Sequence, residues 1–188
     1  METSVNDEHF IAPVRRWVEE LVIGLNLCPF AKRELVKQRV RFALSPATTE
    51  AALLDDLAHE IERLDATPAI ETTLLIHPGV LTDFFEYTQF LQRADRLLGQ
   101  LKRRGVYQIA SFHPDYEFAD AGADDVGNYT NRSPYPLLHL LREESLERAI
   151  DNHPDTDLIP ARNIALLEAF GVAHMRALLR ACFAARTD

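Results

Sequence analysis

Cysteine, glycine and long apolar runs are all scarce in this chain of 188 residues. The two cysteines, Cys28 and Cys182, are too few for a disulfide framework, so we expect free thiols in a reducing compartment such as the cytoplasm. With only 7 glycines, the chain also lacks a glycine-rich loop for nucleotide phosphates. Its longest apolar stretches, at 74–76 and 137–141, are far shorter than the roughly 20 residues that span a bilayer, so we expect no membrane protein.

Basic residues are outnumbered by acidic residues in this sequence. The counts of 20 Lys+Arg and 29 Asp+Glu give a formal net charge of -9, and no dense basic run occurs. Binding to the phosphate backbone of DNA or RNA is therefore not expected as the main activity. Residues 1–8 lack the basic and apolar regions of a secretory signal, and we expect a flexible tail there. The length suits a single domain over 9–188.

The spacing of apolar residues predicts alternating helices and strands. Repeats of three and four residues predict helices over 13–27, 48–67, 82–105, 133–150, 164–170 and 172–185. Short apolar or alternating runs predict strands over 38–44, 72–76 and 106–112. Residues 114–132 are rich in Asp, Gly and Asn without any period, and a loop of this length in a domain is usually functional or disordered.

This order of elements predicts an α/β fold. We expect a small, mainly parallel sheet of three or more strands, covered by helices and followed by a C-terminal helical segment. The connections between parallel strands should be right-handed crossovers. The alternative is a ferredoxin-like α+β sandwich with one further strand, near Ile70 or Glu117.

Each predicted strand ends in a polar residue followed by proline. The three pairs are Ser45-Pro46, His77-Pro78 and His113-Pro114. If the strands are parallel, these polar residues share the carboxyl edge of the sheet, where open α/β folds bind ligands. A simpler interpretation is that proline merely terminates the strands and that each histidine is hydrogen-bonded within its loop.

A second cluster of polar residues surrounds the start of the predicted helix over 133–150. Asn131 and Arg132 precede this helix, whose N-terminus offers unpaired N–H groups to an anion. Within it, His139 and Arg142 are three residues apart and share a face, and a buried Arg142 needs a partner such as Glu143, Asp115 or a substrate anion. The alternative is a capping loop whose polar side chains satisfy their own backbone.

Cys28 is a third candidate because Pro29 after it marks a new helical turn. A cysteine that caps a helix close to Lys32 and Arg33 would favour its thiolate form and could act as a nucleophile. The alternative is a small buried apolar residue, which is the commonest role of a lone cysteine.

Three segments also resemble a known bacterial family. They are the run from Leu27 to Ala31, the run from Ser111 to Pro114, and the run from Asn128 to Glu143. Together they are similar to the family catalogued as the domain of unknown function 1415, and the resemblance covers most of the chain, roughly to Gly171. The resemblance implies no activity. It rests on the same segments that contain the candidate site residues described above.

The leading hypothesis is an enzyme that acts on a small anionic molecule at the carboxyl edge. Three imidazoles could hold Zn²⁺ or Fe²⁺ with an open position, which favours a metal-dependent hydrolase or oxidoreductase. The predicted metal ligands are His77, His113 and His139. The predicted substrate-binding residues are Asn131, Arg132 and Arg142.

Two other functions fit the same residues. In the first, Cys28 is a catalytic nucleophile that His113 or His77 activates, and Asp115 orients the imidazole. In the second, the site only binds a ligand, or the chain is an adaptor whose acidic residues at 120–125 contact a basic partner.

Overall fold

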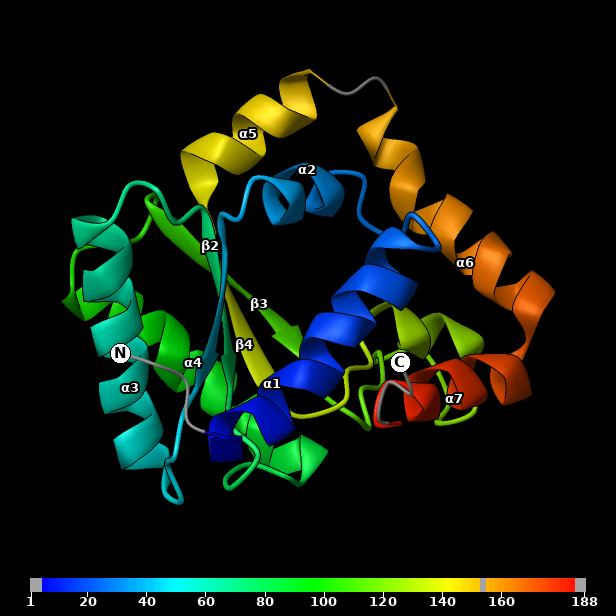
Figure 1. Ribbon diagram of the computed structural model, residues 1–188, viewed down its shortest axis with the longest axis horizontal. Helices are drawn as coiled ribbons and strands as arrows, with labels where there is room; N and C mark the ends of the chain where they lie inside the picture. The colour runs from blue at the N-terminus through cyan, green and yellow to red at the C-terminus, as the bar shows by residue number, and fades with distance from the viewer. Residues whose placement is uncertain (1–4, 153–154, 185–188) are drawn as a thin grey trace.

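The centre of the structure is a four-stranded sheet with helices on both faces (Figure 1). A computed structural model of the chain describes residues 5–152 and 155–184. The strand order is β1-β2-β4-β3. Its members are β1 (Val40–Leu44), β2 (Thr72–Ile76), β3 (Tyr107–Phe112) and β4 (Leu137–Arg142). Strand β2 is parallel to β1, and β4 is antiparallel to both β2 and β3. The three strands predicted from the sequence therefore run in one direction, and β4 opposes them.

The prediction of one helix over 133–150 is wrong in its first part, which contains strand β4. Residues 137–142 form a strand between β2 and β3, and only the following α5 (Glu143–Asp151) is helical. Periodicity failed here because β4 is covered on both faces, and a continuous apolar run cannot be told from a buried helix. The sheet is consequently mixed, with one parallel pairing and two antiparallel pairings, rather than mainly parallel.

The ferredoxin-like alternative is also wrong. From β1 onward the strands and main helices follow the order β-α-β-α-β-β, whereas a ferredoxin-like fold has the order β-α-β-β-α-β. The further strand lies at 137–142 and not near Ile70 or Glu117.

Helices α3 (Glu50–Ala66) and α4 (Phe84–Gln100) cover one face of the sheet, which we call the α4 face. Both begin at side-chain caps: Thr49 Oγ1 accepts from the amide of Ala52, and Asp83 Oδ1 accepts from the amide of Glu86. Their apolar stripes pack on residues such as Leu75, Leu138 and Leu140 in one buried cluster.

The opposite face, which we call the α1 face, is covered by α1 (Val5–Trp17), its continuation as the π-helical segment η1 (Val18–Ile23), and the C-terminal helices. These are α6 (Ile159–Phe170) and α7 (Val172–Ala181), which lie beyond α1 from the sheet (Figure 1). Smaller elements are α2 (Ala31–Val36) and two 3-10 turns, η2 (Val126–Thr130) and η3 (Thr156–Leu158).

The N-terminal boundary differs from the prediction. Helix α1 begins at Val5, so residues 5–8 of the predicted tail are helical, while residues 1–4 lie outside the described part. Residue 185 of the predicted last helix is likewise outside it. Within the described ranges, no helix is long and apolar enough to cross a bilayer.

Candidate ligand site

The carboxyl edge brings two of the predicted histidines together. His77 and His113 directly follow β2 and β3, and both are fully buried. The ring of Tyr87 on α4 lies 5.9 Å from the ring of His77 and 5.2 Å from that of His113. Ser45, at the end of β1, donates instead to Asp56 Oδ2 at 2.5 Å and accepts from the amide of Ala47.

Burial keeps both edge histidines in the neutral form, and hydrogen bonds determine which ring nitrogen donates. His77 Nδ1 donates to the carbonyl of Val80 at 3.0 Å, and His113 Nε2 donates to that of Leu81 at 3.2 Å. The backbone amide of Asp115, not its carboxylate, donates to His113 Nδ1 at 3.0 Å. Burial lowers the pKa of His77 to about 4 and also lowers the pKa of His113. These rings therefore hold the segment after β2 against the edge.

Asn131 and Arg132, predicted to bind substrate, stabilise the loop over 114–132. Asn131 Nδ2 donates to the carbonyl of Ser111 at 3.0 Å. The Arg132 guanidinium donates to the carbonyls of Tyr116 and Ala123, at 3.1 and 2.8 Å, and lies over the ring of Tyr129. These contacts favour the alternative interpretation, a loop that satisfies its own polar groups.

The third predicted substrate ligand, Arg142, binds carbonyl oxygens at the end of α3. Its guanidinium donates to the carbonyl of Leu64 at 2.6 Å and to that of Ile70 at 3.1 Å. It also donates to the hydroxyl of Tyr107 at 3.1 Å. The partners considered from the sequence, Glu143 and Asp115, are not among these contacts.

His139 and Cys28 lie apart from the edge histidines. His139 is in the middle of β4 on the α1 face, whereas His77 and His113 pack against Tyr87 of α4. Cys28 lies on the α1 face too, so the sheet separates it from the base predicted to activate it. Among residues 5–152 and 155–184, no three His, Cys, Asp or Glu side chains are grouped to hold a metal ion. The three predicted metal ligands therefore do not converge on one site.

A cavity of about 300 Å³ lies on the α1 face, and we call it the chamber. It is bounded by the sheet, η1, α2 and α5. Helices α2 and α5 bear no fully buried side chain in the described part, although Leu35 of α2 packs against the buried cluster of this face. They form the roof of the chamber. Apolar side chains dominate its wall: Trp17, Val18, Val22, Phe30, Val40, Leu74, Phe112, Leu141 and Leu146.

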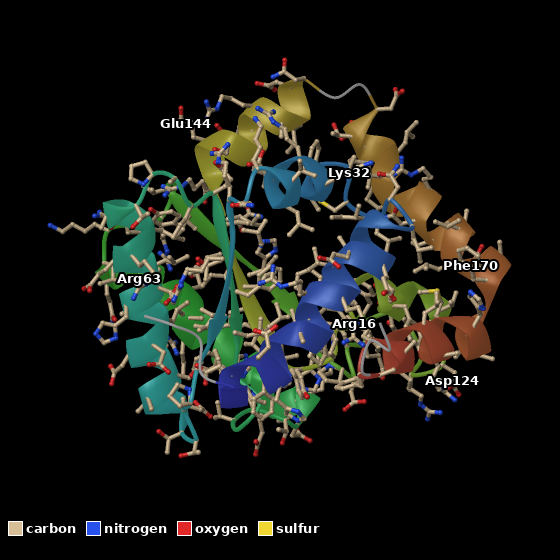
Figure 2. The ribbon with its side chains drawn as sticks, in the orientation of Figure 1. Arg16, Lys32, Arg63, Asp124, Glu144 and Phe170 are labelled. Carbon is tan, nitrogen blue, oxygen red and sulfur yellow. The ribbon has the colours of Figure 1, made fainter. Side chains whose placement is uncertain are left out.

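A second cavity of about 440 Å³ adjoins the chamber, and we call it the mouth. The two cavities share five wall residues, namely Phe30, Glu34, Glu71, Ser145 and Ala149. Three arginines line the mouth: Arg33 of α2, Arg148 of α5 and Arg39, which directly precedes β1. Lys32 and Glu144 mark the same two helices in Figure 2.

Positive charge is in excess at the mouth. Arg39 pairs with Glu71 and lies 3.1 Å from Glu34, and Arg33 lies 3.6 Å from Glu34. Arg148 donates to the carbonyl of Glu144 and to the hydroxyl of Ser145, and in the described part of the chain no carboxylate lies within 4.0 Å of it. The mouth therefore presents three guanidinium groups against two carboxylates.

One polar pair in the chamber has a defined proton arrangement. The hydroxyl of Thr72 donates its only proton to the carbonyl of Leu140 at 2.5 Å. It must therefore accept from His139 Nε2, which is 2.7 Å away. This assigns the ring proton to Nε2 and leaves a lone pair on Nδ1, and burial lowers the pKa of His139 to about 4. Nδ1 has no hydrogen-bond partner among the described residues.

The sequence analysis did not identify the mouth residues as a site, because they come from four separate segments. One signal was nevertheless present. Arg39 and Glu71 directly precede β1 and β2, and the register pairs Val40 with Thr72. Residues before adjacent parallel strands lie side by side, so their opposite charges could have indicated the pair. The mouth thus lies at the amino edge of β1 and β2, opposite the edge that the sequence favoured.

These features define an α/β protein with a mixed four-stranded sheet and a two-part cavity at its amino edge. The model of the family described as "Protein of unknown function (DUF1415)" matches residues 9–177, and the chain belongs to this family. The resemblance found in the sequence is thereby confirmed. No curated protein and no solved structure matches the chain.

Proposed function

We propose that this protein binds a small molecule with an apolar body and an anionic group, the body in the chamber and the anionic group in the mouth. The observation that carries the proposal is the shared wall between an apolar chamber and a mouth with an arginine that has no carboxylate partner among the described residues. The expected ligand, a small anionic molecule, is the one that the sequence suggested, but at another site.

The size and chemistry of the two cavities support this ligand class. Pockets for small molecules commonly measure about 300–1,000 Å³ and combine an apolar wall with a few polar groups. The chamber, at about 300 Å³, has room for a single ring or a short acyl chain. Transfer of such a group from water provides roughly 25 cal/mol for each Å² of apolar surface buried. A guanidinium fork then selects a carboxylate or phosphate.

The state of the thiols supports a reducing compartment such as the cytoplasm. Cys28 and Cys182 are both free. Cys28 lies in the chamber wall, where an oxidised sulfur would alter the apolar surface that the ligand contacts.

The proposal is tested by calorimetric titration with 3-phenylpropionate, which carries one ring and one carboxylate. We expect saturable binding at one site. Arg148→Gln should weaken it about tenfold, because a charge-assisted hydrogen bond is lost. Arg104→Gln is the matched control, since Arg104 pairs with Asp95 on the surface, 60% exposed, and faces neither the chamber nor the mouth. No binding to the native chain, or equal affinities in both variants, would contradict the proposal.

A further inference from the structure

We infer that the buried end of the ligand carries a neutral hydrogen-bond donor, such as a hydroxyl group, that His139 Nδ1 accepts in the chamber. This inference rests on the proposed function and specifies the ligand class of the same site: a hydroxylated aromatic or aliphatic anion. It goes beyond size and charge, because it assigns a polar contact to the end of the ligand that is remote from the three arginines of the mouth.

The position of His139 determines which end of the ligand it meets. His139 lines the chamber but not the mouth, whereas Glu34 and Glu71 line both. Its neighbours in the chamber include Phe112, whose ring lies 6.1 Å from the imidazole, and Trp17, whose ring lies 5.3 Å from that of Phe112. A ligand whose anionic group lies near Arg148 therefore directs its opposite end toward the imidazole.

The contact with Thr72 makes His139 an acceptor rather than a donor toward the ligand. Because the Thr72 hydroxyl is committed to the carbonyl of Leu140, the imidazole proton must stay on Nε2. Nδ1 can then only accept. The ring also stays neutral at pH 7, since burial lowers its pKa.

The unsatisfied acceptor Nδ1 of His139 should discriminate between ligands with and without a hydroxyl group. A ligand with only apolar atoms would bury the lone pair of Nδ1 without a partner, which carries the desolvation cost of an unsatisfied polar group. A ligand with a hydroxyl group at the same place satisfies it. Sites built to bind a hydroxyl reject analogues that lack it far more strongly than apolar pockets reject a changed methylene group.

The experiment compares two probes that differ by one hydroxyl group. Calorimetric titrations of the native chain at pH 7 use 3-phenylpropionate and 3-(4-hydroxyphenyl)propionate. We expect the hydroxylated acid to bind about tenfold more tightly, the factor that one net hydrogen bond provides. Equal affinities, as expected if a water molecule satisfies Nδ1, would overturn the inference while leaving the proposed function intact. Failure of both acids to bind would overturn the proposed function and the inference with it.

Variants assign the preference to His139. In His139→Phe a phenyl ring replaces the imidazole and the acceptor Nδ1 is lost. The affinity ratio of the two acids should therefore fall to about one. The matched control is His59→Phe, because His59 is exposed on α3 and lines neither cavity. A second variant, Thr72→Val, releases the ring proton to either nitrogen and should reduce the ratio without removing the imidazole. A ratio that is unchanged in both chamber variants would refute the role of His139.

Discussion

His77 is a buried neutral imidazole whose environment opposes protonation. It has no exposed surface, its Nδ1 donates to the carbonyl of Val80, and its Nε2 has no partner among the described residues. Desolvation lowers its pKa to about 4, and the nearby His113 acts in the same direction. The stability of this edge of the sheet should therefore depend on pH, because protonation would place a charge on a buried imidazole.

The stability of the protein should therefore decline in mild acid. The unfolded imidazole has a pKa of about 6.5 and binds a proton below that pH, whereas the folded imidazole stays neutral down to about pH 4. The free energy of unfolding is therefore unaffected by His77 above pH 6.5. As the pH falls from 6.5 to 4, the linkage to His77 lowers it by about 3 kcal/mol. Urea denaturation at several pH values measures this decline.

Substitution separates His77 from the other titrating groups. In His77→Gln the free energy of unfolding should decline less steeply between pH 6.5 and 4 than in the native chain, because one proton-linked group is gone. His59→Gln is the control, since its exposed imidazole should leave the slope unchanged. Identical slopes in all three proteins would show that His77 does not resist protonation.

Residue types could be inferred from the sequence more readily than their partners. The prediction that a buried Arg142 needs a partner anticipated its hydrogen bonds, but two of its acceptors are main-chain carbonyls that carry no sequence signature. The edge position of His77 and His113 followed from the strand ends. His139 was placed on a helix, so its pairing with Thr72 could not be foreseen.

Strand β4 is the element that unites the sheet and the candidate site. It pairs with β2 on one side and β3 on the other, and it bears His139 toward the chamber and Leu138 toward the α4 face. The predicted strands over 38–44, 72–76 and 106–112 match β1, β2 and β3 because each is short and bounded by turn residues. The run at 137–141 is continuously apolar apart from His139, and it lacks the β-branched residues that mark 72–76 as a strand, so its pattern also fits a buried helix.

Truncation of a buried side chain on β4 should be costly. Leu138→Ala removes a fully buried side chain from the cluster between the sheet and α3 and α4, so we expect the free energy of unfolding to fall by about 3 kcal/mol. The control is Leu158→Ala, because Leu158 is 60% exposed and its truncation should change stability by less than about 0.5 kcal/mol. Urea denaturation measures both, and similar small losses would contradict the central position of β4.

At the scale of the whole molecule, charge and cavity shape concentrate at one edge of the sheet. The chain carries a net charge of -9, yet three arginines gather at the mouth beside an apolar chamber. The sequence could predict neither cavity, because their walls combine residues from η1, α2, α5 and all four strands. Such a wall depends on the tertiary packing of distant segments and leaves no local pattern.

Trp17 can report ligand binding in the chamber through its fluorescence, since it is the single tryptophan of the chain and lies in the chamber wall. The most direct test of the central claim is a fluorescence titration with 3-(4-bromophenyl)propionate, whose bromine quenches an indole that it contacts. We expect saturable quenching in the native chain. We also expect loss of quenching in Ala110→Leu, which fills the chamber, and unchanged quenching in Ala58→Leu on α3, away from both cavities. Absence of quenching in the native chain, or equal quenching in Ala110→Leu, would contradict a ligand site in the chamber.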